Sequence, residues 1–185
     1  ADAARVDDMR QKFQRGIDVF RQYGKSVYDF PWYVMVGEPG AGKTEAIRNS
    51  SINFPEGLQD KQQGVGGTYS MDWWFTDRAI LLDTAGALLT ESDSATRFEE
   101  FLKMLKTHRP DCPINGMIIA VSVESLLLDD VGASDQKGLN LSRQLTIIQK
   151  VLGIRFSVYL MITKSDLITG FKEFCDAPAN TGYDR

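Results

Sequence analysis

The chain has 185 residues, of which 43% are hydrophobic and 25% charged, and its formal net charge is −4 at pH 7. This length can bury one sizeable core, while the acidic balance argues against nucleic acid as a partner, because non-specific binding requires a cationic surface. No apolar run approaches the roughly 20 residues of a membrane helix, and the two cysteines, Cys112 and Cys175, have no metal-ligand spacing. We therefore expect a globular domain from a reducing compartment, without a disulfide framework.

The first predicted element is an amphipathic helix within residues 1–28. Apolar side chains recur there at steps of three and four residues from Val6 to Tyr23, and Gly24 ends the pattern. We expect this helix to pack on a domain that spans residues 29–185. Because the chain starts inside the helical pattern without an initiator Met, we interpret it as a fragment of a longer membrane protein.

Strand-like and helix-like segments then alternate along the chain. The predicted strands are residues 32–36, 69–75, 79–83, the run around Ile118, and 156–162. Helices with apolar faces are predicted around residues 98–105 and 141–152. The two strands on either side of residues 76–78 form a hairpin. The pattern predicts an α/β fold with a mostly parallel sheet, an antiparallel edge hairpin and helices on both faces.

The sequence Gly37-Glu38-Pro39-Gly40-Ala41-Gly42-Lys43-Thr44 directly follows the first predicted strand. It fits the Walker A pattern, in which glycines let backbone N–H groups surround a phosphate, and the lysine adds a positive charge. The hydroxyl of Thr44 would bind Mg²⁺, and a helix starting near Lys43 would aim its N–H groups at the same anion. A glycine-rich turn with a chance Lys-Thr is the alternative. The motif and its position predict a P-loop NTPase of the Ras-like GTPase type.

A second nucleotide signature, Asp83-Thr84-Ala85-Gly86, ends the strand at residues 79–83. Ligands of such sheets bind at the carboxyl ends of the strands, so Asp83 is predicted to share Mg²⁺ with Thr44. The backbone N–H of Gly86 would approach the γ-phosphate. Thr68 is predicted to reach Mg²⁺ and the γ-phosphate from a switch loop, the alternative being a threonine that only starts a strand.

A third signature, Thr163-Lys164-Ser165-Asp166, follows the last predicted strand. A carboxylate such as Asp166 can accept two hydrogen bonds from guanine that adenine cannot offer, and the stem of Lys164 can lie along a base. We place Thr163, Lys164 and Asp166 in a base pocket that favours GTP, with ATP as the alternative.

The position after Gly86 is Ala87, whereas Ras-like enzymes carry a Gln there that orients the attacking water. A methyl group cannot do this, so we expect slow hydrolysis. Glu38, Asp72 and Glu91 are the nearby acidic candidates, and none is assigned.

Three other features have structural interpretations. Trp73 and Trp74 would face opposite sides of a strand, one in the core and the other at an interface or under a loop. We expect His108 to act at a helix end, where a cationic ring suits the carbonyl dipole, rather than as a general base. Asp129 and Asp130 read as a solvated turn rather than a metal pair.

A further set of segments carries a family resemblance: residues 31–37, 64–68, 72–76, 82–86, 108–110, 113–116, 155–160 and 163–166. Together these segments closely resemble the cytoplasmic nucleotide-binding domain of the TssM/IcmF family. The resemblance implies a domain at the cytoplasmic face of the bacterial inner membrane, within a core component of the type VI secretion system. It also implies TssL/DotU-type and TssJ-type subunits and the baseplate as partners, and membrane attachment through segments outside this chain.

Two functions fit these observations. The first is an Mg²⁺-dependent NTPase that binds GTP or ATP and acts as a slow conformational switch. The second is an interaction scaffold of the same complex that hydrolyses nothing.

Overall fold

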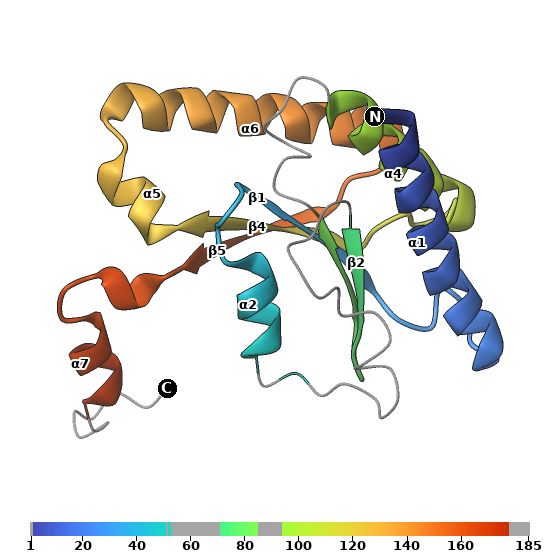
Figure 1. Cartoon of the computed structure of the whole chain (residues 1–185), viewed down its shortest axis with the longest axis horizontal. Helices are drawn as coiled ribbons and strands as arrows, with labels where there is room; N and C mark the ends of the chain where they lie inside the picture. Colours follow the sequence, from blue (N-terminus) through green and yellow to red (C-terminus); the bar gives the residue numbers. More distant parts are fainter. Residues whose placement is uncertain (1, 51, 53–70, 85–93, 178–185) are drawn as a thin grey trace.

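The computed structural model describes residues 2–50, 52, 71–84 and 94–177, which build a five-stranded sheet covered by helices (Figure 1). The strands are β1 (Trp32–Gly37), β2 (Met71–Phe75), β3 (Ile80–Thr84), β4 (Gly116–Ser122) and β5 (Ser157–Thr163). Their order is β2-β3-β1-β4-β5. β1, β3, β4 and β5 are parallel, and β2 is antiparallel to β3. The predicted α/β sheet with an antiparallel edge hairpin is therefore confirmed.

Helices lie on both faces of this sheet. They are α1 (Asp2–Gln22), α2 (Lys43–Arg48), α4 (Ser94–His108), α5 (Val123–Leu128), α6 (Val131–Leu152) and α7 (Phe171–Asp176), with a 3₁₀ turn η1 at Ser165–Leu167. α2 covers one face, and α1, α4 and α6 cover the other (Figure 1). The short elements α5, η1 and α7 were not predicted from the sequence, because none is long enough to show a period.

The alternation of side chains along the strands explains why both faces are covered. On β1, Trp32, Val34 and Val36 join the larger core cluster formed with α1, α4 and α6. Met35 points to the other face and packs with Ile47 of α2. A strand that is apolar at every position has two faces to bury, which requires helices on each side.

Helix α1 contributes an aromatic and aliphatic stripe to the larger core cluster. Met9, Phe13, Ile17 and Phe20 are all buried there, whereas Tyr23 at the end of the predicted stripe is exposed. Gly16 lets the helix approach closely, since a Cβ at this position would overlap the indole of Trp73. The helix therefore packs directly on β2 through this glycine.

The tryptophan pair on β2 is buried on both faces of the sheet. Trp73 and Trp74 do face opposite sides, but each is only 4% exposed. Trp73 packs edge-on against Trp32 at 5.0 Å between ring centroids, and Trp74 joins the smaller cluster beside α2. Trp73 is therefore in the core as predicted, and the burial of Trp74 excludes the interface alternative but not packing under a loop.

The segment after α4 serves packing. Arg109 is buried, its guanidinium lies 4.6 Å from the ring centroid of Trp32, and both terminal nitrogens donate to Asn115 Oδ1 at 3.3 Å. The same oxygen accepts from the backbone N–H of Trp32 at 2.8 Å. Asn115 and Arg109 therefore fasten the start of β1 to the connection between α4 and β4.

His108 is the last residue of α4, as predicted. Burial and the positive charge of Arg21 lower the pKa of His108, which favours the uncharged ring. The ring lies against Phe13, with 5.3 Å between centroids. The position of His108 at the end of α4 is as predicted, and its capping role stays a prediction.

Within the described residues, β5 is an edge strand, and it differs from the prediction of strands covered on both faces. Val158 is 43% exposed and Leu160 is 64% exposed, whereas Met117 and Ile119 on the neighbouring β4 are buried.

No helix in the described part of the chain is both long and apolar enough to cross a membrane.

Candidate functional site

The candidate site lies where four parallel strands end at one edge of the sheet. Gly37, Thr84, Ser122 and Thr163 are the last residues of β1, β3, β4 and β5. Residues 37–42, here called the glycine-rich loop, connect β1 to α2 at this edge. Ligands of open α/β sheets bind outside the carboxyl ends of the strands.

The backbone of the glycine-rich loop needs its glycines. Gly40 and Gly42 have φ angles of 75° and 79°, in the left-handed region that side chains with a Cβ rarely adopt. Gly37 runs so close to β4 that a Cβ would overlap the carbonyl oxygen of Ala120. The loop therefore folds into a tight curve directly before α2, as its sequence predicts.

Lys43 lies inside this curve and not in solvent. It is 7% exposed, and its Nζ donates to the carbonyl oxygens of Gly37 at 3.1 Å and Glu38 at 3.3 Å. Burial lowers the pKa of Lys43, and the negative charge of Asp83 acts in the opposite direction. A desolvated ammonium group held by weak neutral acceptors can exchange them for an anion.

Thr44 and Asp83 meet beside Lys43. The Thr44 hydroxyl donates to Asp83 Oδ2 at 2.6 Å, although the residues are far apart in sequence. Asp83 is fully buried, and burial raises its pKa to about 6 even though Thr44 and Lys43 act to lower it. Its second oxygen, Oδ1, has no hydrogen-bond partner among the described residues. These oxygens form a donor set that suits a hard cation.

The end of β5 touches the glycine-rich loop through one side chain. The Thr163 hydroxyl donates to the carbonyl oxygen of Ala41 at 2.6 Å. Lys164 follows with a φ of 55°, and its Nζ lies 2.7 Å from Glu124 Oε2 on α5. Asp166 is exposed in η1. Thr163 is thus brought to the loop, whereas Lys164 is paired with α5.

Some predicted site residues cannot be placed. Thr68, Gly86, Ala87 and Glu91 lie outside the described residues. Of the second signature, the structure describes only Asp83 and Thr84. The Thr84 hydroxyl donates to the carbonyl oxygen of Met35 on β1 at 2.8 Å.

The contacts of the Glu38 side chain were missed by sequence reasoning. Its carboxylate turns toward α5 and α6, where Ser125 donates to Oε2 at 3.1 Å and Lys137 Nζ lies 3.1 Å from Oε1. Asp129 binds the same Lys137 at 2.7 Å, and Asp130 accepts from the N–H of Ala133 as the N-cap of α6. The prediction of a solvated turn therefore holds for Asp130, which is exposed, whereas Asp129 is partly buried in an ion pair. Nothing local in the sequence links position 38 to position 137.

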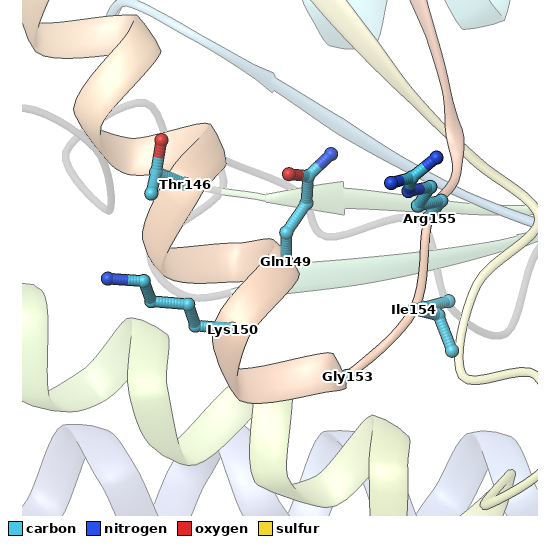
Figure 2. Close-up of a pocket in the computed structure, with 6 residues that line it drawn as sticks. All are labelled: Thr146, Gln149, Lys150, Gly153, Ile154 and Arg155. Carbon is cyan, nitrogen blue, oxygen red and sulfur yellow. The ribbon is translucent and has the colours of Figure 1, made fainter.

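A separate pocket of about 350 Å³ lies at the end of α6, lined by Thr146, Gln149, Lys150, Gly153, Ile154 and Arg155 (Figure 2). These residues precede β5, so the pocket is at the amino ends of the strands, opposite the glycine-rich loop. Lys150 points away from Arg155 in Figure 2, so the two positive charges do not converge on one ligand. The pocket is not part of the candidate site.

Two comparisons with known proteins agree with the resemblance. Residues 91–184 match the family model described as the IcmF-related N-terminal domain. The chain belongs to the TssM/IcmF family. This TssM/IcmF chain is also 42% identical over 161 residues to the type VI secretion system component TssM1 of Pseudomonas aeruginosa, an alignment that covers 83% of this chain. The chain spans only 14% of the length of that relative.

Proposed function

We propose that this TssM/IcmF chain binds a nucleoside triphosphate with Mg²⁺ at the glycine-rich loop and hydrolyses it slowly, as a conformational switch in a type VI secretion component. The observation that carries the proposal is the buried contact between Thr44 and Asp83 beside Lys43. A fully buried carboxylate whose pKa is raised to about 6 costs stability in the free protein. Such a cost is typical of a ligand-binding site.

The residues present fit a magnesium ion. Asp83 offers a carboxylate with one oxygen free of hydrogen bonds among the described residues, and Thr44 offers a hydroxyl. Both are hard oxygen ligands of the kind that Mg²⁺ prefers. When bound, the ion would neutralise charge on the β- and γ-phosphates.

The chain's own groups would do the rest of the binding. The curved backbone between Gly37 and Gly42 offers N–H groups, and Lys43 would turn its ammonium from the loop carbonyls to a phosphate. Thr163 holds the loop from β5 through Ala41. We assign Gly86 and Thr68 to the γ-phosphate and Thr68 also to the metal on their sequence positions alone.

The base preference and the slow turnover are proposed from the sequence alone. Asp166 would bind guanine, with Lys164 beside the base, and GTP is therefore the first choice over ATP. Ala87 in the place of a water-orienting Gln favours a slow turnover.

The wider setting is proposed from the family. The relative is a type VI secretion system component, and we propose that the protein containing this chain has the same role. In that role the domain would lie at the cytoplasmic face of the inner membrane, attached through segments outside this chain. Its partners would be TssL/DotU-type and TssJ-type subunits and the baseplate.

Calorimetric titration with GTP, ATP, their diphosphates and non-hydrolysable analogues, with and without Mg²⁺, tests the proposal. We expect tighter binding of triphosphate than of diphosphate, and loss of binding in Lys43→Ala. Asp166→Ala should weaken GTP and leave ATP unchanged. The alternative is a scaffold that hydrolyses nothing, which Ala87 favours. Equal affinity for nucleoside triphosphate and diphosphate would support it.

A further inference from the structure

The glycine-rich loop is held from outside by a cluster that the proposed nucleotide contacts do not use. We call Glu38, Ser125, Asp129 and Lys137 the loop clamp. Glu38 belongs to the loop, Ser125 to α5, Asp129 to the turn after α5, and Lys137 to α6. In Figure 1, α5 and the start of α6 lie on the same side of the sheet edge as the end of β1.

Lys137 is the centre of the loop clamp. Its Nζ lies 2.7 Å from Asp129 Oδ2 and 3.1 Å from Glu38 Oε1, and it donates to the Ser125 hydroxyl at 2.7 Å. The Ser125 hydroxyl in turn donates to Glu38 Oε2 at 3.1 Å. The two carboxylates raise the pKa of Lys137, which therefore stays charged. Both oxygens of Glu38 are thus occupied on the side facing α5 and α6.

Glu38 connects this clamp to Lys43 through its own backbone. The carbonyl oxygen of Glu38 accepts from Lys43 Nζ at 3.3 Å, while its side chain points to Lys137. Fixing the side chain therefore fixes the peptide group that holds the ammonium. A carboxylate in the second position of a phosphate-binding loop would also repel an incoming anion if it could swing inward.

We infer that Lys137 is a positioning residue, which acts through Glu38 to fix the glycine-rich loop and to keep a carboxylate away from the triphosphate. This deepens the proposed function and rests on it. Lys137 does not touch the nucleotide in this account, and its effect on binding requires Glu38. The Glu38 and Lys137 side chains are 41% and 43% exposed, so the effect is modest.

A double-mutant cycle tests the inference. Affinity for non-hydrolysable GTP and ATP analogues with Mg²⁺ is measured for the wild type, Lys137→Met, Glu38→Gln and the double variant. We expect Lys137→Met to weaken binding about two- to fivefold, from the range of exposed charge pairs. In the Glu38→Gln background the same change should have less than half of that effect on a logarithmic scale. Lys137→Arg should keep the wild-type affinity, because the side chain at position 137 stays positively charged.

The matched control is Lys150→Met, which removes the same charge from an exposed position of α6 at the other end of the helix. It should leave the affinity unchanged. Additive effects of Lys137→Met and Glu38→Gln, or an equal loss in Lys150→Met, would overturn the inference and leave only a long-range charge effect.

A second measurement separates this inference from the proposed function. Hydrogen exchange of the backbone amides of residues 37, 38 and 40–42 needs no nucleotide. We expect several-fold faster exchange in Lys137→Met and in Glu38→Gln, with no further increase in the double variant. A wild type that binds no nucleotide but shows this pattern would refute the proposed function and support the loop clamp. Unchanged exchange in both single variants would refute the clamp itself.

Discussion

Asp83→Asn is expected to stabilise the free protein while removing the proposed magnesium site. Asp83 is fully buried, and its pKa is raised from 3.8 to about 6, chiefly by burial. Between these two values the unfolded chain ionises the carboxyl and the folded protein does not. The contribution of Asp83 to stability is therefore complete below pH 3.8 and is lost as the pH rises through about 6.

The size of the effect follows from the two pKa values. They differ by about 2, which corresponds to about 3 kcal/mol of stability absent at pH 7.5. Asparagine resembles the uncharged carboxyl and can still accept from Thr44. The variant should therefore exceed the wild type by about 3 kcal/mol at pH 7.5 and by about 1 kcal/mol at pH 4.5. For a domain of this size, the first value corresponds to a Tm roughly 6 to 12 °C higher.

Thermal and urea unfolding without nucleotide or metal measures the difference. Asp135→Asn, a charge removal on the exposed surface of α6, is the control and should give the same small offset at both pH values. An Asp83→Asn variant that is less stable than the wild type at pH 7.5, or whose advantage does not shrink on acidification, would refute the reasoning. With Mg²⁺ and GTP analogue, the wild type should gain stability and the variant should not.

Three further predictions concern packing and a second titration. Gly16→Ala should lower the free energy of unfolding by about 1 to 3 kcal/mol, because the new Cβ overlaps the indole of Trp73. Gly138→Ala has open space around it and should raise the free energy of unfolding by up to about 1 kcal/mol. Urea unfolding compares the two variants. Asn115→Ala should cost about 1 to 2 kcal/mol in the same assay because a strand amide and a buried guanidinium lose their acceptor, and Asn115→Asp should lose less. Because the pKa of His108 is lowered, the wild type should lose stability relative to His108→Gln as the pH falls below 6.5, and a constant difference between pH 7.5 and pH 5 would contradict this.

The sheet could be predicted because its signals are local. An apolar run, a turn and a glycine-rich stretch each depend on neighbouring residues, so β1, the β2–β3 hairpin, β4 and α6 could be found from the sequence. The core contact of Gly16 with Trp73 could not, since it joins a helix to a strand far along the chain.

The candidate site divides in the same way. The glycine-rich loop and the meeting of Thr44 with Asp83 follow from two rules, that such loops sit after a strand and that ligands lie at strand ends. The loop clamp follows from no such rule, because Lys137 reaches Glu38 only through the packing of α6 beside the end of β1. The lowered pKa of His108 could not be predicted from the sequence, because burial is its main cause and burial is a property of the fold.

The most direct test of the account is the calorimetric binding of a non-hydrolysable GTP analogue with Mg²⁺ to the wild type and to Lys43→Ala. We expect saturable binding to the wild type, weaker binding without Mg²⁺, and a loss of affinity of at least about tenfold in the variant, since a buried charged hydrogen-bond donor is removed. No binding to the wild type for either the GTP or the ATP analogue, or equal binding to both proteins, would contradict the central claim that the glycine-rich loop holds a triphosphate.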